Sequence, residues 1–169
     1  LFLYLCKKTG MINRIIKGSI LSDYKRRKVI VLLGARQVGK TTLLSELCEG
    51  KDRVLSLNCD NVDDVLALEG KTTTELRQLL SSYELVLIDE AQRVKNVGLT
   101  LKMIGDLKLE TQVVVTGSSS LDMADEINEP ATGRLIEYNL FPFSLPELAL
   151  YSSEREENRL LENRMIYGL

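Results

Sequence analysis

One nine-residue stretch constrains the fold of this chain more than any other feature. Residues 34–42 read Gly-Ala-Arg-Gln-Val-Gly-Lys-Thr-Thr, which matches the pattern G-x-x-x-x-G-K-[ST] in full. The β-branched run 29–33 before it predicts a buried strand, and residues 42–48 after it predict a helix with leucines on one side. A strand, a glycine loop and a helix in this order predict a loop whose backbone N–H groups converge on a phosphate.

Each residue type in this loop has a physical reason. Gly34 is expected to allow the sharp exit from the strand, and Gly39 to keep Cβ atoms away from a bound phosphate. Lys40 is expected to reach the β- and γ-phosphates of a nucleotide, and the Thr41 hydroxyl to bind Mg²⁺. The alternative is a plain glycine turn, which the agreement of strand, loop and helix disfavours. The expected phosphate-binding residues are Gly34, Ala35, Arg36, Gln37, Val38, Gly39, Lys40, Thr41 and Thr42.

A second motif places two carboxylates at the end of another strand. The apolar run 85–88 is followed directly by Asp89 and Glu90. Its continuous apolar pattern predicts a strand buried on both faces, and open parallel sheets bind ligands at the carboxyl ends of their strands. We therefore expect Asp89 to hold Mg²⁺ together with Thr41, and Glu90 to be the general base that activates a water. This motif is weak alone but specific when it follows a complete phosphate loop.

Hydroxyl side chains gather at the end of a third buried strand, expected over 112–116. Thr116 and Ser118 are candidate sensors that could hydrogen-bond the attacking water or the terminal phosphate. The two serines that follow could instead cap a helix that begins at Leu121, and both interpretations can hold for different residues.

Arg134 precedes the last expected strand, 135–140. Phosphoryl transfer gains from an arginine at the developing charge, either in its own site or in that of a neighbouring molecule. The alternative for Arg134 is a surface ion pair at the start of a strand.

The remaining elements follow from periodicity and from capping residues. Asp60, Asp63 and Asp64 could suggest a metal cluster, but capping of a helix N-terminus explains them better. Thr74 is expected to cap a short helix, and residues 144–147 form a capping box with a proline in its first turn. The remaining expected elements are an amphipathic helix over 12–24, a strand over 53–58, and helices over 65–69, 75–80 and 97–107.

Composition narrows the available chemistry. The 169 residues suit one compact domain, and the absence of histidine excludes a histidine base or metal ligand. Three cysteines without metal-ligand spacing fit ordinary thiols in a reducing cytoplasm. No apolar run reaches the roughly 20 residues that span a bilayer, so no membrane partner is expected.

The charge is uneven although the net charge is only −2. The whole chain therefore gives no electrostatic case for nucleic-acid binding. A basic N-terminal face could meet an acidic partner, including a nucleic acid, but such a run is more often a solvated surface. The cations of this run are Lys7, Lys8, Arg14, Lys17, Lys25, Arg26, Arg27 and Lys28, against Asp23 alone.

Taken together, these motifs resemble the P-loop ATPases of the AAA-like group. More narrowly, the chain is similar to a family of bacterial and archaeal ATPases in which an AAA domain precedes a C-terminal domain of unknown function. The resemblance covers most of residues 11–150. It rests on the motifs at 34–44, 85–92, 115–120, 132–134 and 140–148.

The resemblance implies an α/β fold with three α-β-α layers and a parallel five-stranded sheet of order 5-1-4-3-2. It implies ATP and Mg²⁺ as ligands, with Lys40 and Thr41 binding phosphate and metal, Asp89 serving Mg²⁺ and Glu90 serving catalysis. It also implies Ser118 as a sensor and Arg134 as an arginine finger or sensor. A homo-oligomer or a protein partner is compatible with it.

The expected division of the chain combines the resemblance with the position of Met11, which opens a well-patterned segment. Residues 1–10 are interpreted as an extension of uncertain origin, 11–150 as the ATPase domain, and 151–169 as a charged helical tail that begins a following, truncated domain. The expected activity is Mg²⁺-dependent ATP hydrolysis coupled to movement of a missing domain or partner. The alternative is a switch that binds ATP with little turnover. A small-molecule kinase is less expected because the Asp-Glu pair points to water, and a GTPase lacks its Asn-Lys-x-Asp motif.

Overall fold

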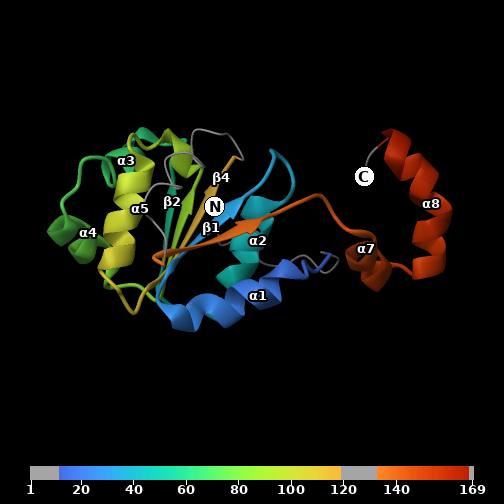
Figure 1. The fold of residues 1–169 in the computed structure, drawn as a ribbon, viewed down its shortest axis with the longest axis horizontal. Helices are drawn as coiled ribbons and strands as arrows, with labels where there is room; N and C mark the ends of the chain where they lie inside the picture. The colour runs from blue at the N-terminus through green and yellow to red at the C-terminus, as the bar shows by residue number, and fades with distance from the viewer. Residues whose placement is uncertain (1–11, 119–132, 168–169) are drawn as a thin grey trace.

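Five parallel strands form the centre of the protein in a computed structural model that describes residues 12–118 and 133–167. Their order across the sheet is β2-β3-β4-β1-β5, which confirms the predicted order 5-1-4-3-2 read from the other edge (Figure 1). All pairs are parallel. The strands are β1 (Val29–Leu33), β2 (Val54–Asn58), β3 (Leu85–Asp89), β4 (Gln112–Gly117) and β5 (Leu135–Asn139).

Helices cover both faces of this sheet and complete the predicted three layers (Figure 1). Two 3₁₀ turns, η2 (Tyr24–Arg26) and η3 (Ala91–Arg93), lie between the longer elements. The α-helices are α1 (Ile16–Asp23), α2 (Lys40–Leu47), α3 (Val62–Leu66), α4 (Thr73–Leu80), α5 (Val97–Asp106), α7 (Leu145–Tyr151) and α8 (Glu154–Tyr167).

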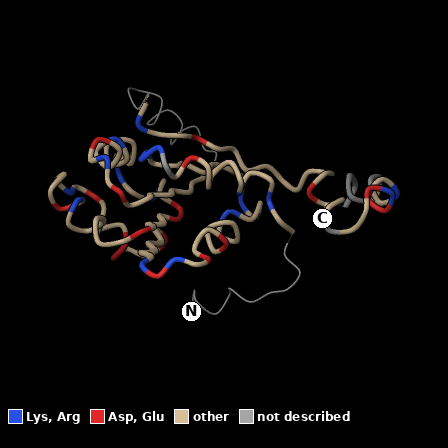
Figure 2. Tube along the Cα trace, turned by 90° about the horizontal axis from the view of Figure 1, so that it is seen from below, with Lys and Arg blue, Asp and Glu red and all other residues tan. Residues whose placement is uncertain are grey.

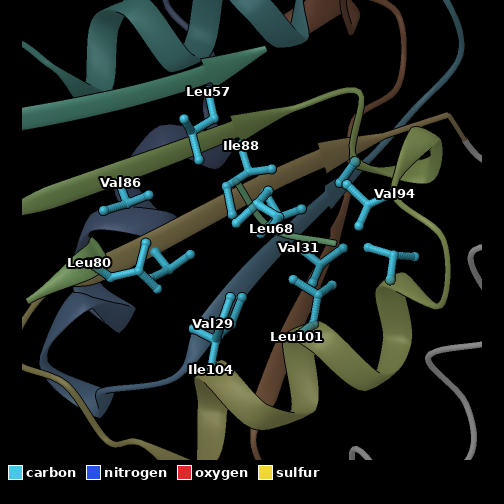
Figure 3. Close-up of a cluster of buried hydrophobic side chains, with 14 of the residues drawn as sticks. Val29, Val31, Leu57, Leu68, Leu80, Val86, Ile88, Val94, Leu101 and Ile104 are labelled. Atoms are coloured by element: carbon cyan, nitrogen blue, oxygen red, sulfur yellow. The ribbon is translucent and has the colours of Figure 1, made fainter. Parts of the chain in front are cut away.

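The alternation of side chains along β1 divides the core in two. Val29 and Val31 point to the face covered by α4 and α5, where they meet Leu101 and Ile104 (Figure 3). Ile30 and the other even-numbered residues point to the opposite face, where they pack against α1 and α2. Because every residue of β1 is buried, its sequence is continuously apolar. The second cluster contains Ile20, Ile30, Leu32, Leu43, Leu44, Leu47, Leu85, Leu87, Val114 and Leu140.

The register brings the carboxyl ends of the strands to one edge of the sheet. Leu33 pairs with Gly117 on one side and with Asn139 on the other. Asn58 pairs with Asp89 at the next junction. The loop that leaves β1, the carboxylates that follow β3 and the hydroxyls that end β4 are therefore neighbours.

The N-terminal helix begins later than its isoleucine spacing predicts. α1 starts at Ile16, and Ile15 is 58% exposed instead of joining the core. Arg14 lies ahead of the helix and is buried, because its guanidinium finds polar partners in other segments. Ile20 occupies the core as expected.

Two helix starts also differ from the prediction. Thr72, not Thr74, caps α4, because it forms a reciprocal capping box with Glu75. Asn61 caps α3 by accepting a hydrogen bond from the backbone of Asp63, which stands in the first turn. In the part of the chain that the structure describes, no group of three or more acidic, Cys or His side chains could hold a metal ion. The prediction that the aspartates cap this helix is therefore wrong in its residue, since Asn61 is the cap, while Asp63 and Asp64 stand in the first turn, where negative charge stabilises a helix N-terminus.

The C-terminal helices lie apart from the sheet, beyond the end of β5 (Figure 1). The predicted capping box at the start of α7 is confirmed: Ser144 accepts from the backbone of Glu147, whose carboxylate accepts in turn from the backbone of Ser144. None of the described helices is both long and apolar enough to cross a membrane. The expected boundaries at residues 10 and 150 remain predictions.

Candidate functional site

The loop between β1 and α2 requires glycine at two positions, Gly34 and Gly39, for two different physical reasons. Gly39 has φ 94°, a left-handed conformation that favours glycine. Gly34 does not have a positive φ; a Cβ built there would lie 2.6 Å from the carbonyl oxygen of Leu140. Gly34 is therefore required by the close packing of the loop on the segment after β5, in addition to its place at the exit from the strand.

Lys40 is the first residue of α2 and is buried beneath the loop. Its Nζ donates to the carbonyl oxygens of Gly34 at 2.7 Å and Ala35 at 3.0 Å. No side chain caps the N-terminus of α2, because its N-cap is Gly39. The loop thus presents a helix start with free N–H groups beside a lysine, which is the arrangement that binds phosphate.

A cavity of about 630 Å³ opens over this loop. Most of its lining comes from the loop and the start of α2, and Glu90 reaches it from the end of β3. The lining residues are Arg36, Gln37, Gly39, Lys40, Thr41, Thr42 and Glu90.

Asp89 joins the loop to the neighbouring strands. The Thr41 hydroxyl donates to Asp89 Oδ2 at 3.2 Å, and the Thr116 hydroxyl donates to Asp89 Oδ1. Hard oxygen ligands are what Mg²⁺ prefers, and Thr41 and Asp89 bring two of them together next to the phosphate loop. The residues present therefore fit the metal ion that the sequence predicts.

Glu90 follows β3 directly and has a left-handed backbone conformation, with φ 55°. Its N–H donates to Thr116 Oγ1 at 3.2 Å. Its carboxylate oxygen Oε2 accepts from Gln92 Nε2 at 2.5 Å. Gln92 Oε1 in turn accepts from the backbone N–H of Ser118 at 3.3 Å. The structure thus brings the sequence-predicted residues Glu90 and Ser118 together through a third residue.

Arg134 lies at the other end of the sheet. Its carbonyl accepts from the N–H of Val29, the first residue of β1, and its Nε is ion-paired with Asp106. The five residues of β1 rise by about 3.3 Å each, which puts Arg134 roughly 15 Å from the start of the phosphate loop. The structure therefore does not bring Arg134 to the pocket of its own chain, and the ion-pair interpretation fits it.

Burial, with a further contribution from nearby carboxylates, keeps a thiol beside the site protonated. Cys59 follows β2 and is buried. Burial raises the pKa of Cys59 to about 12, and the carboxylates of Asp64 and Asp89, among others, add to this rise. Cys59 is therefore a protonated, structural thiol at neutral pH, in agreement with the sequence-based expectation of an ordinary buried thiol.

Two residues, Gln92 and Arg14, were not predicted from the sequence to belong to this site. Gln92 follows Asp89 and Glu90 in the same motif, and this position in the sequence indicates that its side chain could lie near theirs. No local pattern indicates that Arg14 belongs to the site, because it lies among isoleucines in an expected helix. Its guanidinium donates to the carbonyl of Val38 in the phosphate loop at 2.9 Å.

Four cations of the basic N-terminal run, among the residues that the structure describes, are paired with carboxylates. Arg14 pairs with Glu147, Lys17 with Glu46 and Glu49, Arg26 with Asp23, and Arg27 with Glu110. Figure 2 shows positively and negatively charged residues interspersed along the chain. The pairs made by the exposed Arg26 and Arg27 favour the solvated-surface interpretation over an acidic partner, whereas Arg14 is buried. Lys7 and Lys8 lie outside the described residues, as does the helix start expected at Leu121.

Comparison with known proteins agrees with this geometry. A protein-family model described as "AAA domain" matches residues 26–149. A solved structure entitled "crystal structure of DNA replication initiation factor" is similar to the chain, with 19% identity and a TM-score of 0.51. The match covers 92% of this chain and 52% of that one, so the chain spans about half the length of this structural neighbour. A search of the curated proteins gave no match.

Proposed function

Because the chain belongs to the AAA domain family, we propose that it binds ATP with Mg²⁺ at the phosphate loop and hydrolyses it to ADP and phosphate. One observation carries this proposal. Thr41 at the start of α2 and Glu90 just after β3 line a single cavity, and the Asp89 carboxylate accepts a hydrogen bond from the Thr41 hydroxyl at 3.2 Å. These are the residues that phosphoryl transfer to water needs: a metal-binding hydroxyl, a metal-binding carboxylate and a base.

The proposed steps use groups of this chain. The N–H groups of the loop and of the start of α2 bind the phosphates, and the Lys40 ammonium exchanges its two carbonyl partners for phosphate oxygens. Mg²⁺ held by Thr41 and Asp89 would neutralise charge on the β- and γ-phosphates. Glu90 takes a proton from a water whose oxygen bonds to the γ-phosphorus, while the bond to the β–γ bridging oxygen breaks and ADP leaves.

The proposal includes coupling to movement outside the pocket. Arg14 donates a hydrogen bond to the Val38 carbonyl in the phosphate loop and also pairs with Glu147 in the first turn of α7. α7 and α8 lie apart from the sheet (Figure 1). A change in the loop on nucleotide binding therefore has a direct hydrogen-bonded route to the segment that leaves the domain.

A second candidate function is a nucleotide-dependent switch that binds ATP with little turnover. One observation favours it: in this structure both Lys40 and Glu90 are engaged by protein partners, namely the loop carbonyls and the Gln92 amide. A switch would bind ATP and keep Glu90 in that contact.

Phosphate release and ATP binding, measured on the same purified chain with Mg²⁺ and with EDTA, separate the two functions. We expect Mg²⁺-dependent phosphate release, and loss of ATP binding in Lys40→Ala. The matched control is Lys51→Ala, an exposed lysine that does not line the cavity. Tight binding without release would favour the switch, and absence of binding to the wild-type chain would refute both functions.

A further inference from the structure

Gln92 bridges the segments that follow two neighbouring strands, β3 and β4. It lies in η3, two residues after Glu90, and is half-buried. Its Nε2 donates to Glu90 Oε2 at 2.5 Å, and its Oε1 accepts from the backbone N–H of Ser118 at 3.3 Å. One amide therefore spans from the carboxylate after β3 to the end of β4.

The chemistry of the two partners fixes the orientation of this amide. An ionised carboxylate only accepts, and a backbone N–H only donates. A side chain that satisfies both must carry a donor and an acceptor on one planar group. Glutamate at position 92 would have no donor for Glu90, and lysine would have no acceptor for Ser118.

The main chain and the side chain of Glu90 are held separately. The backbone of Glu90 is held through its N–H on the hydroxyl of Thr116, a residue of β4 that is completely buried. The carboxylate is held by Gln92, which is itself hydrogen-bonded to Ser118 just beyond β4. Both contacts set Glu90 relative to the end of β4, and the left-handed backbone of Glu90 needs such support.

We infer that Gln92 is a positioning residue, whose amide fixes the Glu90 carboxylate relative to Ser118 and the cavity. This inference rests on the proposed function, in which Glu90 acts on a water. A base contributes only when it is held within hydrogen-bond reach of the proton it removes, and small misplacements are costly. Gln92 does not line the cavity. It acts on the reaction through Glu90.

Two variants of Gln92 separate its two hydrogen bonds. Gln92→Met keeps the length of the side chain but removes both bonds, whereas Gln92→Glu can still accept from Ser118 and cannot donate to Glu90. We expect kcat for ATP hydrolysis to fall roughly tenfold in both variants, as loss of an orienting outer partner typically does. We expect the Kd and KM for ATP of Gln92→Met to stay within about twofold of wild type, because its phosphate loop is unchanged.

The control is Gln78→Ala, which removes the same side chain from an exposed position of α4 and should leave kcat unchanged. Wild-type kcat in either Gln92 variant would overturn the inference. So would a loss of kcat in Gln92→Met that is matched by loss of ATP binding or by unfolding, since this would indicate a structural role. A wild-type chain that binds ATP without releasing phosphate would instead refute the proposed hydrolysis, and the inference with it.

Discussion

Arg14 and Glu147 form an ion pair that is almost completely buried, with Nε and Oε1 3.1 Å apart and side chains only 6% and 7% exposed. The remaining Arg14 donors reach the carbonyls of Val38 and Phe141, and the guanidinium carbon lies 4.5 Å from the centroid of the Phe143 ring. This single residue therefore ties the phosphate loop to the turn before α7 and to the first turn of that helix.

We expect Arg14→Ala to lower the free energy of unfolding by about 3 kcal/mol, because it leaves a buried carboxylate without its partner. Urea unfolding followed by circular dichroism measures this change. The control is Arg27→Ala, which breaks an exposed pair with Glu110 and should cost less than about 1 kcal/mol. Equal losses in both variants would contradict the structural role of Arg14.

The same junction should make stability depend on acid pH. Burial raises the pKa of Glu147, but hydrogen bonds from Ser144 and Ile15, together with Arg14, outweigh burial and hold it below its usual value. A carboxyl whose folded pKa is lowered stabilises the fold above its unfolded pKa of about 4.3. That stabilisation is lost as the pH falls through the folded pKa.

The unfolding free energy of wild type should therefore fall more steeply below about pH 4.3 than that of Glu147→Gln, which should start lower at pH 7. Urea unfolding between neutral and acid pH checks this difference. Glu110→Gln, an exposed substitution, serves as control and should follow wild type. Parallel curves for wild type and Glu147→Gln would show that this carboxylate does not contribute.

Substitution by alanine should have opposite effects on stability at two glycines, Gly34 and Gly18. A Cβ at Gly34 would lie 2.6 Å from the Leu140 carbonyl oxygen, so Gly34→Ala should destabilise the fold and distort the phosphate loop. Gly18 lies in α1 with no atom within 4 Å of a built Cβ, so Gly18→Ala should stabilise by about 0.5–1 kcal/mol. Thermal unfolding of the two variants tests the pair, and a stabilising Gly34→Ala would contradict the packing described here.

Arg134 should not contribute to hydrolysis within its own chain, since it pairs with Asp106 at the far end of the sheet. Arg134→Ala is expected to leave the rate per chain unchanged at low protein concentration. If a neighbouring copy uses this arginine, the wild-type rate per chain should rise with concentration and that of Arg134→Ala should not. A lower rate in the variant at every dilution would contradict the placement of Arg134.

Local patterns predicted the central strands because β1, β3 and β4 are buried on both faces. The continuous apolar runs at β1 and β3 and the complete phosphate loop predicted buried strands and the two motifs at their ends, whereas the strand order was predicted from the resemblance to AAA-like ATPases. The position of Thr116 beside Asp89 also follows from the ends of neighbouring parallel strands. These features depend on residues that are close in sequence or on general rules for parallel sheets.

Long-range polar contacts were beyond local patterns. Arg14 was expected within an amphipathic helix and in a basic run, but its partner Glu147 lies 133 positions away, and no periodicity predicts such a pair. The start of α4, in contrast, was a local signal that the prediction missed: of Thr72 and Thr74, only Thr72 stands three residues before Glu75, the spacing of a capping box. The role of Gln92 depends on an amide that meets two strands, which requires the folded structure.

The central claim is that Glu90 activates the water that hydrolyses ATP, and Glu90→Gln tests it most directly. Parallel measurement of ATP Kd and of phosphate release should show binding within about threefold of wild type, because the phosphate loop and Asp89 remain. Phosphate release should fall at least about 100-fold, as expected for loss of a general base. Unchanged release with unchanged binding would contradict the claim and remove Glu90 from the reaction.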